Sequence, residues 1–181
     1  MKLIPFSNLT VFLLSLVSAA AFLGSAATTQ AQNPQLASFS PQFTASQVAH
    51  LRDVRTTAYT HSEKSHSKWG LYNASGGQLT ASVGYNSAAA DWSRFPLGTT
   101  FRVVGEPTIY VVDDYGSALV GTDTIDIYCP SMQAMNQWAT RHLRIEILQF
   151  GSYERSKKLL EGRVKHAHCK AMLDSIKRQG L

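Results

Sequence analysis

Between positions 53 and 150, the sequence is a series of short stretches rich in β-branched and aromatic residues, separated by Gly, Pro, Asn and Ser. Such stretches are typical of β-strands, and the residues between them are typical of turns. The predicted strands cover residues 54–60, 78–83, 100–104, 108–112, 124–128 and 141–150. One short helix is expected among them, over residues 131–140, with Ser131 as its N-cap. Several short strands at close spacing predict a small β-barrel or a β-sandwich.

The last part of the sequence, residues 153–179, follows a helical pattern instead. Apolar residues recur there every three or four positions, as in an amphipathic α-helix: Leu160, Val164, Ala167 and Ala171. From Arg155 onward, this segment holds eight Lys or Arg residues and two acidic residues. These basic residues either attract a polyanionic surface or form the solvated face of a helix packed on the barrel.

Residues 1–31 are typical of a secretory signal peptide. A positive charge precedes an apolar run over residues 11–24, and small residues follow, so cleavage is expected after Ala27 or Ala31. Residues 32–50 are then a linker, since most of them are polar and uncharged. We therefore expect an exported protein, either released or held at a membrane only by an uncleaved N-terminus. No other stretch is long and apolar enough to span a bilayer.

About 150 residues remain after processing, which is enough for one domain with its own core. We place this domain at residues 51–151 and the basic C-terminal helix at residues 152–181. The chain has two cysteines, Cys129 and Cys169. In an exported protein they could form a disulfide, and the alternative is two separate buried thiols. A zinc site is not expected, because the spacing of Cys169 and the neighbouring histidines fits no standard pattern.

Residues 111–128 combine four carboxylates with apolar and small residues, and they contain no Lys or Arg. The four are Asp113, Asp114, Asp123 and Asp126, in a chain whose formal net charge is +5. Carboxylates without neutralising partners raise one another's pKa. A protein can keep one carboxyl protonated near neutral pH in this way and use it as a general acid. The alternative is that these are ordinary turn and capping aspartates.

Asp126 is the strongest argument for a functional site, because strands disfavour Asp and this one lies between Ile125 and Ile127 in a predicted strand. Side chains alternate along a strand, so Asp126 points away from the face that the two isoleucines occupy. If the isoleucines fill the barrel, Asp126 faces a surface cleft. Asp91 and Asp114 adjoin turns, and strand pairing is expected to bring them close to Asp126.

Three sequence motifs resemble those of a known family. Residues 114–126, DYGSALVGTDTID, are similar to the D-x-G-G-A-I-K-G…D signature of lytic transglycosylase A enzymes and three-aspartate (3D) domain proteins. Residues 88–99, AAADWSRFPLGT, resemble the family's AVD…IPLGT, and residues 56–60, TTAYT, resemble its opening strand. The resemblance extends from the region of Arg55 to that of Phe150.

This resemblance implies a small six-stranded double-psi β-barrel that acts on peptidoglycan glycan strands, in the periplasm or cell envelope of a bacterium. It also implies a lytic transglycosylase, which cuts between N-acetylmuramic acid and N-acetylglucosamine and forms a 1,6-anhydro ring. The family aspartates correspond to Asp91, Asp114 and Asp126. Asp126 would be the single acid and base, and the other two would hold substrate hydroxyls or tune it. Asp113 and Asp123 would be neighbours that only add charge.

The resemblance also implies residues that contact the substrate. Tyr59 and Trp92 are candidate platforms for stacking on sugar rings, unless they belong to the core. The loop of the main motif would contribute Gly116, Ser117 and Gly121. The family carries Lys where this chain has Val120. We expect a monomer that uses no cofactor and no metal.

Two other functions stay open. One is a non-catalytic glycan-binding barrel, as in expansin-like proteins that share this fold. The other is an inverting hydrolase in which Asp114 and Asp126 hold a water between them. His61 and His66 are expected on a polar surface loop. A nucleic-acid-binding role is not expected, because the chain carries an export signal and a central cluster of acidic residues.

Overall fold

The structure is a computed structural model that describes residues 50–64 and 66–181. The predicted signal peptide (residues 1–31) and nearly all of the predicted linker (residues 32–50) lie outside the described residues. No helix in the described part of the chain is long and apolar enough to cross a membrane.

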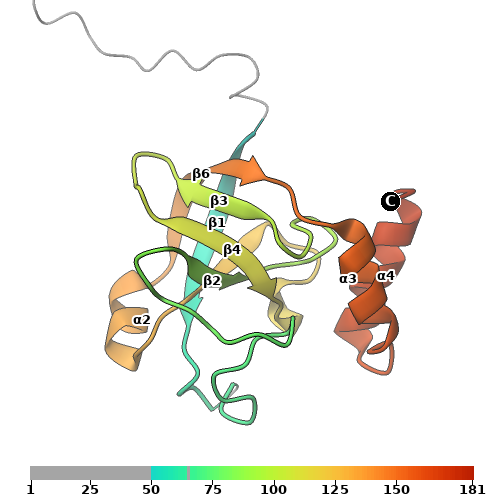
Figure 1. The fold of residues 1–181 in the computed structure, drawn as a ribbon, viewed down its shortest axis with the longest axis horizontal. Helices are drawn as coiled ribbons and strands as arrows, with labels where there is room; N and C mark the ends of the chain where they lie inside the picture. The colour runs from blue at the N-terminus through green and yellow to red at the C-terminus, as the bar shows by residue number, and fades with distance from the viewer. Residues whose placement is uncertain (1–49, 65) are drawn as a thin grey trace, which may run out of the picture. The chain divides into compact units, whose positions relative to one another are not determined.

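Six strands form a closed β-barrel in the order β1-β5-β2-β4-β3-β6 (Figure 1). The strands are β1 (Leu51–Tyr59), β2 (Asn86–Ala89), β3 (Thr100–Val103), β4 (Ile109–Asp114), β5 (Thr124–Tyr128) and β6 (Arg141–Gln149). The β1–β5 and β2–β4 pairs are parallel, and the other neighbouring pairs are antiparallel. The predicted small double-psi β-barrel is confirmed by this closed, mixed six-stranded sheet.

The barrel interior is filled by alternate residues of the strands. Ile125 and Ile127 of β5 are buried there, whereas Asp126 between them is only half-buried. Neighbouring strands add further side chains with no exposed surface: Ala88, Phe101, Val112 and Ile145. The predicted alternation along β5 is therefore confirmed, and it turns Asp126 away from the core.

Residues 78–83, predicted as a strand, form only isolated bridges in the structure. Gln78 pairs with Tyr72, and Ala81 pairs with Asn86. Each barrel strand already has a neighbour on both sides, so the barrel offers this segment no unpaired edge. The segment is instead part of the long connection between β1 and β2.

Helix α2 (Met132–Trp138) links β5 to β6 and agrees with the helix predicted from the sequence. Its N-cap is Ser131, whose hydroxyl accepts a hydrogen bond from the Ala134 amide at 3.2 Å. At the other end, the Trp138 indole donates to the Thr56 hydroxyl at 3.2 Å. This contact fixes the helix on β1.

The C-terminal part of the chain forms two helices, α3 (Tyr153–Glu161) and α4 (Ala167–Arg178), and not the single helix predicted over residues 153–179. Helix α3 is capped by Gly162, and the chain reverses before α4 begins (Figure 1). This reversal lets the apolar faces of both helices join the barrel core. Three of these side chains are fully buried: Leu160, Met172 and Ile176. The prediction was wrong because apolar periodicity continues through the turn and does not reveal it.

The helical hairpin formed by α3 and α4 joins the barrel at Gly151. The Gly151 amide donates to Thr99 Oγ1 at 3.0 Å, and a Cβ at this position would collide with the backbone of Pro96 and Leu97. The Ser156 hydroxyl of α3 accepts a hydrogen bond from the Leu97 amide at 2.9 Å. The start of the hairpin is therefore packed closely against the turn that precedes β3.

Candidate active site of buried carboxylates

Strand β4 ends in two consecutive aspartates that are both buried. A register shift in the β2–β4 pairing sets Ala88 opposite Val112 and Ala89 opposite Asp114, which leaves Asp113 as an extra residue. Such β-bulges redirect side chains and are common beside functional sites. Here the bulge accompanies the burial of both aspartates, since Asp113 is 9% exposed and Asp114 is 6% exposed.

Both oxygens of Asp114 are held by donors from separate parts of the chain. Oδ2 accepts a hydrogen bond from the Tyr59 hydroxyl at 3.0 Å. Oδ1 accepts bonds from the backbone amides of Ala74 at 3.0 Å and Tyr115 at 2.9 Å. Burial raises the pKa of Asp114 above its ordinary value, and these hydrogen bonds oppose that shift. The carboxyl is therefore fixed in place and shielded from solvent.

Asp113 is also part of this buried cluster, although the sequence prediction gave it no role beyond adding charge. Its Oδ2 accepts hydrogen bonds from the Ser87 hydroxyl at 2.7 Å and the Asn73 side-chain amide at 2.9 Å. Its Oδ1 is buried, and no described residue donates to it. Burial raises the pKa of Asp113 to about 6. The pair of adjacent aspartates was a partial signal in the sequence, because alternation along a strand turns only one of two neighbours inward and does not predict the bulge that accompanies the burial of both.

Asp126 is half-buried on β5 and keeps one carboxyl oxygen open. Its Oδ1 accepts a hydrogen bond at 2.7 Å from the hydroxyl of Thr57, its cross-strand neighbour on β1. Its Oδ2 accepts none from any residue that the structure describes. Burial raises the pKa of Asp126 to about 6, and the charges of Glu63 and Asp114 add to the shift while the Thr57 hydrogen bond opposes it. Such a carboxyl can donate a proton near neutral pH.

Asp91, the third predicted site aspartate, is 1% exposed and anchors two loops. Its Oδ1 accepts hydrogen bonds from the Ser93 amide at 2.8 Å and the Ser93 hydroxyl at 2.7 Å. Its Oδ2 accepts a bond from the Gly121 amide at 2.7 Å. Asp91 thus ties the loop between β4 and β5 to the turn after β2. The enclosure of the carboxyl argues against contact with substrate hydroxyls, and the alternative, that Asp91 tunes Asp126, stays a prediction.

The two aromatic residues predicted to stack on sugar rings are buried. Trp92 has no exposed surface, its indole N–H donates to the Asp114 carbonyl at 2.9 Å, and its ring lies edge-on to Tyr115. Tyr59 is 7% exposed, and its hydroxyl is bound to Asp114. This burial agrees with the alternative that both residues belong to the core, and it argues against sugar stacking by either ring. They support Asp114 instead.

His61 and His66, expected on a surface loop, lie against the aromatic residues of the site. His61 Nδ1 is 2.8 Å from the Tyr128 hydroxyl. The His66 ring centroid is 5.4 Å from that of Tyr59. Both histidines are half-buried. No periodic pattern marks this loop, so its contacts with β1 and β5 were not predictable from the sequence.

The loop between β4 and β5 contains the other three predicted substrate-binding residues. Gly116 is half-buried, and Ser117 begins the short 3-10 helix η1 (Ser117–Leu119) with its side chain exposed. Gly121 has a φ of +79°, a conformation that favours glycine. Val120, where the family carries Lys, packs against the core. Substrate contact by Gly116, Ser117 and Gly121 stays a prediction.

Cys129 and Cys169 are both free in the structure, so the disulfide considered from the sequence is not formed. Cys169 is fully buried on α4, and its thiol donates to the Tyr115 hydroxyl at 3.3 Å. Cys129 directly follows β5, where its amide donates to the Tyr59 carbonyl. The two thiols are buried separately, which is the alternative reading of their spacing. Over residues 50–64 and 66–181, no group of three or more His, Cys, Asp or Glu could hold a metal ion.

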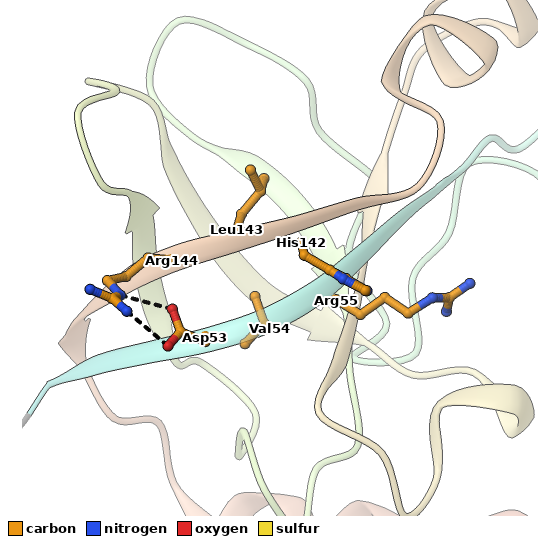
Figure 2. Close-up of a pocket in the computed structure, with 6 residues that line it drawn as sticks. All are labelled: Asp53, Val54, Arg55, His142, Leu143 and Arg144. Atoms are coloured by element: carbon orange, nitrogen blue, oxygen red, sulfur yellow. Dashed lines mark hydrogen bonds and ion pairs between the residues drawn. The ribbon is translucent and has the colours of Figure 1, made fainter.

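A separate surface hollow lies on β1 and β6 and includes none of the buried carboxylates (Figure 2). Its volume is about 390 Å³, and it is lined by Asp53, Val54, Arg55, His142, Leu143 and Arg144. Arg144 donates two hydrogen bonds to Asp53, at 2.8 and 3.0 Å. Both of these side chains are more than half exposed, so the hollow lacks the enclosed polar groups of a binding site.

Residues 86–149, from β2 to the end of β6, match the 3D domain family. The matched region contains Asp91, Asp113, Asp114 and Asp126 but neither β1 nor the helical hairpin. A crystal structure of MltA from E. coli aligns at 29% sequence identity with a TM-score of 0.35, and the alignment covers 44% of this chain and 28% of MltA. No curated protein sequence matches. The chain therefore contains a 3D domain, as its sequence motifs predicted.

Proposed function

We propose that this protein is a lytic transglycosylase that cuts peptidoglycan glycan strands between N-acetylmuramic acid and N-acetylglucosamine. One observation carries the proposal. The half-buried Asp126 has a pKa raised to about 6, and its Oδ2 accepts no hydrogen bond from the described residues. The 3D domain adds support, since the family resemblance implies action on the cell wall.

A lytic transglycosylase needs one group that first gives and then takes a proton. In the proposed mechanism, protonated Asp126 donates its proton from Oδ2 to the glycosidic oxygen as the bond to C1 of the muramic acid breaks. The resulting carboxylate then removes the proton of the muramyl 6-hydroxyl, whose oxygen bonds to C1 and closes the 1,6-anhydro ring. The proton has returned to Asp126, and no water is consumed. Thr57 would keep Oδ1 occupied so that Oδ2 meets the substrate.

Asp114 would act on Asp126 through its charge and not as a second catalytic group. An inverting hydrolase needs a carboxylate that can activate a water. Asp114 is 6% exposed, and both of its oxygens already accept hydrogen bonds. Its surroundings therefore favour the single-aspartate mechanism over the hydrolase.

Two exposed aromatic residues are better candidates for sugar stacking than the buried ones. Trp69 is 58% exposed and Tyr72 is 60% exposed. Both lie in segment 66–74, one end of which packs on Tyr59 while the other donates a hydrogen bond to Asp114. The two rings are therefore on a short connection between two parts of the carboxylate site, where they could bind the apolar faces of sugar rings.

We also propose that the protein is exported and acts as a monomer in a bacterial cell envelope. The support is the signal-like N-terminal sequence and the net charge of +5, which suits a polyanionic wall. An exported form whose N-terminus follows Ala27 or Ala31 would agree with this proposal. Recovery of the protein only in the cytoplasm would contradict it.

The proposed activity is tested by digesting purified sacculi with the protein and identifying the released products by mass spectrometry. We expect 1,6-anhydromuropeptides. Products with reducing ends would indicate hydrolysis instead. Binding to sacculi without release would indicate a glycan-binding barrel.

The role of Asp126 is tested by Asp126→Asn, with Asp123→Asn as the matched control. Asp126→Asn should abolish the release of anhydromuropeptides. Asp123→Asn should retain it, because the Asp123 side chain is 59% exposed and is paired with Arg94 at 2.6 Å. Continued formation of anhydro products by Asp126→Asn would exclude Asp126 as the acid.

A further inference from the structure

One cation from outside the matched 3D domain contacts the residues that hold Asp114. Arg163 lies in the turn between α3 and α4. Its Nη1 donates to the Ala74 carbonyl at 2.8 Å and to the Tyr115 hydroxyl at 3.2 Å. Ala74 and Tyr115 are also the two residues whose backbone amides donate to Asp114 Oδ1. A single guanidinium therefore contacts both residues that supply these amides, Ala74 through its carbonyl and Tyr115 through its side-chain hydroxyl.

Ala74 lies in a turn that packs against the core, and hydrogen bonds to the Asn73 side chain from the Ser75 and Gly77 amides hold the turn. Residues 73–75 belong to the irregular connection between β1 and β2, and hydrogen bonds to Asp113 tie their two ends to the barrel. Among the described residues, only Arg163 donates to the Ala74 carbonyl. Hydrogen bonds from charged donors are stronger than neutral ones, and Arg163 is half-buried, where water screens less. Arg163 thus restrains the Ala74 carbonyl, in addition to the contacts that hold the turn.

Tyr115 is held by the same helical hairpin. Its hydroxyl also accepts a hydrogen bond from the Cys169 thiol at 3.3 Å, and its ring centroid lies 5.6 Å from that of His168. The Arg163 guanidinium lies 5.7 Å from the centre of the Tyr115 ring. The hairpin therefore reaches the barrel at the residue that directly follows Asp114.

We propose that Arg163 is a positioning residue of the carboxylate site, and that the helical hairpin thereby completes the support of Asp114. Arg163 itself does not touch the substrate. It keeps the amides of Ala74 and Tyr115 directed at Asp114, whose charge acts on Asp126. The catalytic part of this inference rests on the proposed transglycosylase activity, whereas the positioning part does not.

Loss of the Arg163 guanidinium should raise the pKa of Asp114 and lower the pKa of Asp126. An N–H that binds an ionised carboxylate lowers its pKa, so loss of the Ala74 N–H raises the pKa of Asp114. With Asp114 more often protonated, the pKa of Asp126 falls, because the charge of Asp114 is one of the causes that raise it. The other titratable or charged groups facing these two carboxyls are Tyr59, His66, Asp113, Glu63, Arg55 and Cys129. None of them is altered by a substitution at Arg163.

The test uses the full-length protein with Arg163→Met, which removes the donors and keeps the alkyl chain. Carboxyl 13C NMR should show the midpoint of Asp114 raised and that of Asp126 lowered, each by roughly half a pH unit. The kcat for anhydromuropeptide release should fall on the order of tenfold, with KM changed less than about twofold. Arg163→Lys keeps a charged donor and should restore most of the wild-type carboxyl midpoints and most of the kcat. Arg178→Met, at an exposed arginine near the end of α4, is the matched control and should change neither.

Unchanged carboxyl titrations in Arg163→Met would overturn the inference even if the melting temperature fell, because they would show a merely structural role. Equal shifts in Arg178→Met would overturn it as well, since one lost positive charge would then explain them. If Arg163→Met does not fold, Tyr115→Phe removes the hydroxyl contact; it should raise the Asp114 midpoint, and an unchanged midpoint would reject the proposal. Shifted titrations in a protein that releases no anhydromuropeptides even as wild type would reject the proposed function and leave the positioning role intact.

Discussion

Single carboxyl groups in this protein differ in how far the fold moves their pKa. Asp53 and Asp174 lie at the surface, and hydrogen bonds from Arg144 and Lys170 lower their pKa values. No cation in the described part of the chain is bound to Asp113 or Asp126, and burial raises the pKa of each to about 6. Their ionisation at neutral pH therefore opposes folding, which is a cost that the surface carboxyls do not carry.

Replacing Asp113 by Asn should flatten the pH dependence of stability. A carboxyl with a pKa of about 6 when folded and 3.8 when exposed binds its proton more tightly in the folded state. The free energy of unfolding therefore falls as pH rises between these two values, by up to about 3 kcal/mol for this group. Urea unfolding at pH 4.5 and pH 7 measures this fall. The free energy of unfolding of Asp113→Asn should fall less between the two pH values than that of wild type. Asp123→Asn is the control, and an unchanged fall in Asp113→Asn would refute the prediction.

For single residues, the sequence predicted the direction of the Asp126 side chain but not the residues that surround it. Alternation along a strand is a local property, so Ile125 and Ile127 were enough to orient the carboxyl. The burial of Asp113 and Trp92 depends on the bulge in β4 and on segments distant in sequence. Those contacts are set by tertiary packing, which a single sequence does not reveal.

Among the larger elements, segment 66–74 is the one that should control affinity for glycan. Trp69→Ala and Tyr72→Ala each remove an exposed ring from the segment whose ends contact Tyr59 and Asp114. Each should raise KM for sacculi roughly threefold to tenfold with little change in kcat. Tyr85→Ala removes a ring that is 42% exposed outside this segment and serves as the control. An equal rise in KM for all three variants, or none for the first two, would argue against stacking at this segment. Binding to isolated glycan strands gives the same comparison without turnover.

The strands were better predicted than the segments between them. Alternating β-branched residues marked β5 with its observed ends, and Ser131 marked the start of α2. Residues 78–83 carry a similar local pattern but find no unpaired strand to join. The single C-terminal helix predicted from the sequence is two helices for a related reason. The chain reverses after Gly162 so that both helices pack on the barrel, and the apolar periodicity does not reveal this turn.

For the whole molecule, the junction of barrel and helical hairpin should limit stability. Gly151→Ala would press a Cβ into the backbone of Pro96 and Leu97, which cannot yield as a flexible side chain would, and we expect destabilisation of about 3 kcal/mol. Gly162→Ala is the matched control, because its φ is −69° and its added Cβ would lie 3.7 Å from the nearest backbone atom. It should be neutral or stabilising by about 0.5 kcal/mol. Equal melting temperatures for the two variants would show that the close approach at Gly151 is not limiting.

The first strand of the barrel in the sequence, β1, lies between the last two, β5 and β6. Strand β1 pairs with β5 on one side and β6 on the other, and the Asp53–Arg144 contact joins residues 91 positions apart. Closing so long a loop is entropically unfavourable and slows folding. A fragment trimmed to the matched residues 86–149 would lack β1 and present two unpaired edges prone to aggregation. During synthesis, β1 emerges from the ribosome before the other strands and has no complete set of partners until β6 emerges, so the barrel can close only after β6 has left the ribosome.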